Sequence, residues 1–179
     1  MKKILLPLVL LVVVMSLTAA TAPRVGRSTI VTLEKGLDDR ISRLWDDNPY
    51  LLLGSTRGVY LENYGAVFTA EVNLVPNPTS LMHANVTKDE VAKARQKKLD
   101  RIPQLKKAMR DALVACAAAM DTVPADEQIT IVTFLSHYPW EDMNGVPSQL
   151  SLQAPRKKLV DAQHAGPAAL EALVRINEN

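Results

Sequence analysis

Residues 66–75, with the sequence AVFTAEVNLV, decide the fold class because their apolar side chains recur at every second position. This period of two, with polar residues between, predicts a strand that is buried on one face. The preceding residues 57–63 are rich in β-forming residues, and Asn63-Tyr64-Gly65 favours a tight reversal. Residues 57–75 therefore predict a β-hairpin. The apolar face would carry Ala66, Phe68, Ala70, Val72 and Leu74, and the other face Val67, Thr69, Glu71 and Asn73.

A second pair of strands is expected over residues 128–154. Residues 128–138 are rich in β-branched side chains and apolar on both alternating faces. This pattern predicts a strand in the middle of a sheet, covered on both sides. After a loop over 139–147, residues 148–154 alternate again between apolar and polar side chains.

Helices are predicted over residues 32–46, 87–121 and 155–176. The first has apolar residues at helical spacing from Leu33 to Trp45. The second begins with a capping-box pattern, Thr87-Lys88-Asp89-Glu90, and Pro103 is expected to kink it or to begin a new helix. In the third, Gly166-Pro167 separates two shorter helices.

The predicted order is therefore α-β-β-α-β-β-α-α, which indicates the α+β class. We expect an antiparallel sheet of about four strands in two hairpin-like pairs (57–75 and 128–154), packed by helices in a single domain over 32–179. This order is similar to that of small sensory and scaffold folds of the roadblock, longin and profilin type. The similarity concerns topology only and carries no functional residue.

The first 22 residues have the three-part pattern of a secretory signal peptide. Lys2 and Lys3 precede an apolar run over 4–15, and small residues follow it over 16–22. The run is shorter than the roughly 20 residues that span a membrane. We therefore expect export to the periplasm or outside the cell, with cleavage after Ala19, Ala20 or Ala22 and a flexible leader over 23–31. The alternative is a membrane anchor formed by an uncleaved signal.

Composition excludes several classes of protein. The chain has 179 residues, 47% of them hydrophobic and 22% charged, as expected of a globular domain. Removing Lys2 and Lys3 with the leader leaves 19 basic and 19 acidic residues, so we expect no nucleic-acid partner. The stretch 88–111 has nine basic and four acidic residues. It could bind an anion, although a solvated helix face is the commoner explanation.

Motifs that mark cofactor or metal chemistry are missing from the sequence. There is no glycine-rich phosphate loop, and the three histidines, His83, His137 and His164, lack metal-ligand spacing. Cys116 is the only cysteine and lies among alanines, which predicts a buried and unactivated thiol. The sequence therefore indicates no catalytic, cofactor-binding or metal-binding residue.

One cluster remains as a candidate binding site. The segment 137–142 gathers an imidazole, two aromatic rings and two carboxylates at a strand end, and the strand face that carries Glu71 is expected nearby. The alternative is a structural loop in which Trp140 closes the end of the sheet and the acids face water. The candidate binding residues are Glu71, His137, Trp140, Glu141 and Asp142.

These observations favour an exported, non-enzymatic binding or structural module with an unknown protein or small-molecule partner. The alternative function is a small hydrolase or ligand-binding protein that uses the His137-Glu141-Asp142 region.

Overall fold

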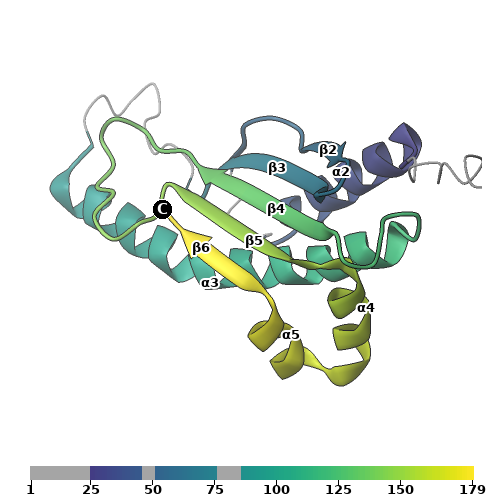
Figure 1. Cartoon of the computed structure of the whole chain (residues 1–179). Helices are drawn as coiled ribbons and strands as arrows, with labels where there is room; N and C mark the ends of the chain where they lie inside the picture. Colours follow the sequence, from purple (N-terminus) through teal and green to yellow (C-terminus); the bar gives the residue numbers. More distant parts are fainter. Residues whose placement is uncertain (1–24, 46–50, 76–85) are drawn as a thin grey trace, which may run out of the picture.

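The 66–75 pattern forms strand β3 (Gly65–Asn73), which lies inside a six-stranded mixed sheet (Figure 1). The computed structural model describes residues 25–45, 51–75 and 86–179. The expected signal peptide, residues 1–22, lies outside them. Along the sheet the strands follow the order β1-β3-β4-β5-β6, and β2 also pairs with β3. The α+β class is confirmed, with more strands than the four expected.

The predicted hairpin over 57–75 is confirmed. Strand β2 (Arg57–Leu61) pairs antiparallel with β3, and Leu61 lies opposite Gly65. Gly65 has a φ of 126°, and a Cβ atom there would lie 1.9 Å from the carbonyl oxygen of Gln128. Only glycine can therefore make this turn beside the neighbouring strand. Strand β1 (Leu51–Leu52) pairs with the far end of β3, opposite Val72 and Asn73.

The two hairpins join differently from the prediction. Strands β4 (Gln128–Leu135) and β5 (Gln149–Pro155) pair antiparallel, as expected. Strand β4, however, runs parallel to β3 along its whole length, so the expectation of a purely antiparallel sheet is wrong. The cause is the long helix between the two strands. It returns the chain to the end of the sheet at which β3 begins, so β4 starts there and runs in the same direction.

That helix is α3 (Lys88–Ala119), which runs along one face of the sheet (Figure 1). Its predicted capping box is present: the Glu90 amide donates to Thr87 Oγ1 at 3.3 Å, and the Thr87 amide donates to Glu90 Oε2 at 2.8 Å. A single helix continues through Pro103, so of the two expected alternatives the start of a new helix is wrong. Ile102 and Leu105 are buried on either side of Pro103, so core packing compensates for the hydrogen bond that proline removes.

Helix α2 (Arg27–Ser42) covers the same face. It begins five residues before the predicted start, within the segment expected to be a flexible leader. Ile30 explains this difference, because it is buried where the helix meets Gly58 and Phe68. Beneath the helices, the buried apolar residues of the three central strands are Ala66, Phe68, Ala70, Val72, Ile129, Ile131, Leu135, Leu150, Leu152 and Ala154.

The C-terminal helix is shorter than predicted. Helix α4 (Arg156–Ala165) and helix α5 (Pro167–Leu173) are separated at Gly166, as expected. The residues after them form strand β6 (Arg175–Glu178), which pairs antiparallel with β5. The unpaired edge of β5 therefore outweighs the weak helical preference of the chain end, as a tertiary contact can.

The opposite face of the sheet is not covered by any helix of the described residues. Val59, Leu61 and Phe134 are exposed on this face, and the register of the strands places Val67 and Val132 among them. The expectation that β4 is covered on both sides is therefore wrong for the described part of the chain. We call these five residues, Val59, Leu61, Val67, Val132 and Phe134, the apolar stripe.

Candidate functional site

The predicted site region lies where the parallel strands β3 and β4 end side by side. Val72 and Leu135 are neighbours at this edge of the sheet, and the chain after β4 continues into the segment 136–147. Ligand sites of sheets with parallel strands often lie beyond the carboxyl ends of such strands. The side chains that meet here come from β3, from this segment and from the N-terminal half of α3.

A buried ion pair between Lys98 and Glu141 is the centre of this region. Each side chain is only 2% exposed. Lys98 Nζ donates to Glu141 Oε2 and, at 3.1 Å, to the carbonyl oxygen of Ser136. Asn73 Nδ2 donates to Glu141 Oε1 at 3.4 Å. Both carboxylate oxygens thus have a donor, which is the condition for a buried charge to be tolerated.

Burial also affects the pKa of Lys98. It lowers the pKa of Lys98 below its ordinary value, because a charged ammonium loses hydration, and the Glu141 carboxylate acts in the opposite direction. The ammonium and the carboxylate neutralise each other at a place where both side chains are only 2% exposed. This arrangement clamps the segment 136–144 onto α3.

The other predicted residues lie around this clamp. Ser136 Oγ donates to Glu71 Oε1 at 2.5 Å, so Glu71 does lie near the segment, as expected. Asp142 Oδ1 accepts from the Asn144 amide at 2.9 Å, and Asp142 lies 3.7 Å from Arg95 Nε. The ring of Trp140 stacks on Tyr138, with centroids 5.9 Å apart and planes at 10°.

His137 stands apart from these contacts. Its side chain is exposed, and among the described residues its imidazole makes no hydrogen bond or ion pair. An acid–base pair needs direct hydrogen-bond reach, and the contacts of Glu141 go to Lys98 and Asn73 instead. The structure therefore brings Glu71, Glu141 and Asp142 to one region without joining them to His137.

Lys98 is the residue that sequence reasoning missed. The basic stretch 88–111 was expected to be a solvated helix face, yet Lys98 and Arg101 are both buried. The expectation that the acids face water also fails for Glu141. The spacing of Lys98, Ile102 and Leu105 on one face of α3 was the available signal.

The described residues contain neither a metal-binding cluster nor an activated thiol. No three side chains of His, Cys, Asp or Glu come together there as ligands. Cys116 is buried, as predicted, and burial raises the pKa of its thiol to about 12. The thiolate form that reacts with electrophiles is therefore disfavoured near neutral pH.

Within residues 25–45, 51–75 and 86–179, every helix is too short or too polar to cross a bilayer.

Comparison with known proteins identifies no relative. No family model matches the sequence, no curated protein resembles it significantly, and no solved structure matches the fold significantly.

Proposed function

We propose that this chain is an exported, non-enzymatic structural module that self-associates by packing the open faces of two sheets together. The observation that carries the proposal is the sequence of β4. Its residues alternate between two apolar sets, and the helices cover only the set with Ile129 and Ile131. The second set, Val132 and Phe134, is not covered by any helix of the described residues, and Phe134 is therefore 44% exposed.

The arrangement of the apolar stripe supports a protein interface. Val59 and Val67 are direct cross-strand partners, and Val132 and Phe134 continue the stripe diagonally onto β4. Polar side chains surround it, among them Thr69, Ser151 and Gln153. An apolar centre with a polar rim is the usual composition of such interfaces, and exposed clusters of this kind mark interaction sites.

A second copy of the chain is the occupant that we propose, because the carboxylate of each face can pair with an arginine of the other. The open face carries two arginines, Arg57 and Arg175, and one carboxylate, Glu71. Two such faces repel each other weakly, and Glu71 of each copy can meet an arginine of the other. Sheets that pack face to face keep their strands about 30° apart and about 10 Å from each other.

The size of the face sets the expected affinity. Five strands lie abreast from β2 to β6. At about 4.8 Å per strand and about 3.3 Å per residue, a face eight residues long measures roughly 600 Å². Stable complexes bury about 800 Å² per partner. We therefore expect a reversible dimer that dissociates in the micromolar range.

Self-association can be tested with a pair of matched variants. Phe134→Glu places a charge in the centre of the proposed interface, and Val31→Glu places one at an exposed apolar position on α2, which covers the other face. In sedimentation equilibrium from about 1 to 200 μM, the wild type and Val31→Glu should dimerise, and Phe134→Glu should remain monomeric.

A wild type that stays monomeric across this range would overturn the proposal, as would equal dimerisation of Phe134→Glu.

The export part of the proposal rests on residues 1–22 alone. Expression of the full chain in a bacterial host should give periplasmic protein whose mass shows cleavage after Ala19, Ala20 or Ala22. Retention of the full-length mass in the cytoplasm would contradict it.

A further inference from the structure

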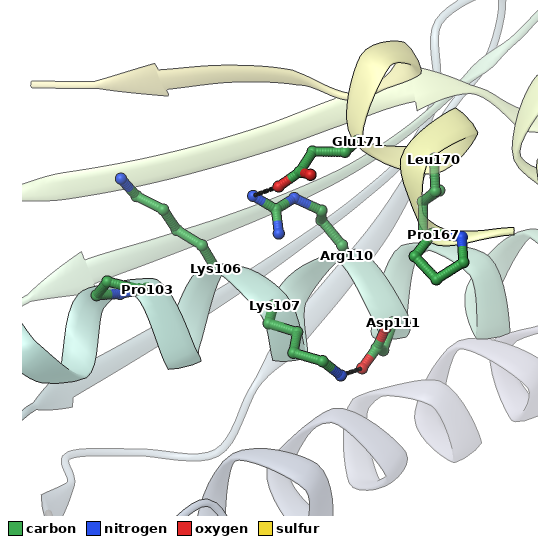
Figure 2. Close-up of a pocket in the computed structure, with 8 residues that line it drawn as sticks. All are labelled: Pro103, Lys106, Lys107, Arg110, Asp111, Pro167, Leu170 and Glu171. Carbon is green, nitrogen blue, oxygen red and sulfur yellow. Dashed lines mark hydrogen bonds and ion pairs between the residues drawn. The ribbon is translucent and has the colours of Figure 1, made fainter.

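A cavity of about 480 Å³ lies between the middle of α3 and helix α5, away from the open face of the sheet (Figure 2). Its lining combines two chemistries. Lys106, Lys107 and Arg110 of α3 contribute positive charge, and Pro103, Pro167 and Leu170 contribute apolar surface. Asp111 and Glu171 complete the lining, so its formal charge is +1. The volume lies in the range that small-molecule sites occupy, about 300–1,000 Å³.

The two central cations are largely buried. The side chains of Lys106 and Arg110 are each 18% exposed. They lie one helical turn apart, which places them on one face of α3. Each has a carboxylate partner from the C-terminal region: Lys106 Nζ lies 2.5 Å from Glu178 Oε1, and Arg110 NH2 lies 3.2 Å from Glu171 Oε1. Both partners are exposed, and ion pairs with exposed carboxylates are weak.

Arg110 retains an unused donor. Its Nε is buried without a hydrogen-bond partner, and a buried donor without a partner is unfavourable. Figure 2 shows the guanidinium group beneath Glu171, which approaches it from one side only. A guanidinium presents its donors as a planar fork that matches the two oxygens of a carboxylate. A ligand carboxylate that displaces Glu171 could therefore take both Nε and the neighbouring terminal nitrogen, so Nε is reached only when Glu171 has moved away.

We infer that this cavity is a binding site for a small organic monocarboxylate with an apolar body. Arg110 binds the carboxylate through its fork, Lys106 adds positive charge beside it, and Leu170 with the two prolines contacts the apolar body. Displacing Glu171 frees one positive charge, because Lys106 and Lys107 keep their own carboxylate partners, and this suits one negative charge better than the two of a phosphate monoester. This site is independent of the proposed dimer, because its residues belong to α3 and α5.

The test uses hexanoate as the probe, with hexanol as its neutral counterpart and inorganic phosphate as a purely polar anion. Isothermal titration calorimetry on the exported form should show saturable binding of hexanoate that weakens with added salt. Arg110→Gln should lower the affinity about tenfold, since a charge-assisted pair contributes roughly that factor. Lys93→Gln, an exposed lysine of α3 outside the cavity, should leave it unchanged.

A gain of affinity separates the inference from simple loss of folding. Glu171→Gln removes the competing carboxylate, so hexanoate should bind several-fold more tightly to this variant. No binding of hexanoate at about 10 mM, or equal binding of hexanol, would overturn the inference. Tighter binding of phosphate than of hexanoate would also overturn it, as would an equal loss of affinity in Lys93→Gln.

Discussion

The two faces of the sheet carry side chains from the same strands, yet they differ in what covers them. The chain has only two phenylalanines, and one lies on each face. Phe68 is fully buried beneath the helices, whereas Phe134 is 44% exposed. The covered face is packed by α2 and α3, and the open face has an apolar stripe that no described residue covers. The difference separates the apolar residues that form the core of the monomer from those that we propose for association.

The largest contrast should come from truncating the two phenylalanines. Phe68→Ala leaves a cavity in the core and should lower the free energy of unfolding by about 3–5 kcal/mol. Phe134→Ala should lower it by only about 1 kcal/mol at a concentration where the chain is monomeric, because nearly half of Phe134 is already exposed to solvent. Chemical denaturation followed by circular dichroism measures both values. Equal losses would show that the two faces are packed alike.

The covered side also holds the buried ion pair, and breaking it should have the next largest effect. Lys98→Ala leaves Glu141 buried without its partner and should cost about 3 kcal/mol. The double variant Lys98→Met with Glu141→Leu removes both charges and should recover most of that loss. Thermal and urea unfolding of the three proteins tests this expectation. If the double variant is no more stable than Lys98→Ala, the clamp does not act as a charge pair.

A smaller, pH-dependent effect should come from Tyr60, which points to the covered side between the exposed Val59 and Leu61. Burial, followed by the neighbouring Glu127, raises the pKa of Tyr60 from 10 to about 12. The folded chain therefore holds the phenol proton more tightly than the unfolded chain. The resulting stabilisation is complete below pH 10 and is lost as the pH rises towards 12.

The unfolding midpoints of the wild type and of Tyr60→Phe, measured between pH 8 and pH 12, test whether stability falls with rising pH as expected. The wild type should lose stability more steeply above pH 10 than the variant. Parallel curves would mean that Tyr60 titrates in the folded chain as it does in the unfolded chain.

Local patterns predicted most of the elements because each depends on a few neighbouring residues. The alternation over 66–75, the turn at Asn63-Tyr64-Gly65 and the capping box at Thr87 are all present in the structure. The parallel pairing of β3 with β4 and the strand β6 were missed. Both depend on which strand edge is available after the helices have packed, and strand periodicity carries no information about that.

The candidate site was predicted in part. Its location at the ends of β3 and β4 was anticipated through Glu71 and Glu141, and the pairing of Glu141 with Lys98 was not. The two residues are 43 positions apart, and no local rule joins a lysine of a helix to a carboxylate of a distant segment. Glu34 is a similar case: it is a charged residue within the predicted helix 32–46, yet it is buried and accepts from the Gly58 amide at 2.8 Å.

By itself the sequence determined most of the helices and strands and which face of β3 is apolar, because side-chain periodicity sets these locally. The tertiary structure alone decided the order and direction of the strands, the burial of Lys98 with Glu141, and the exposure of one apolar set of β4. These features depend on contacts between segments that are distant in the chain. Their free energy is gained only when α3 lies across the sheet, so they follow from the assembled fold.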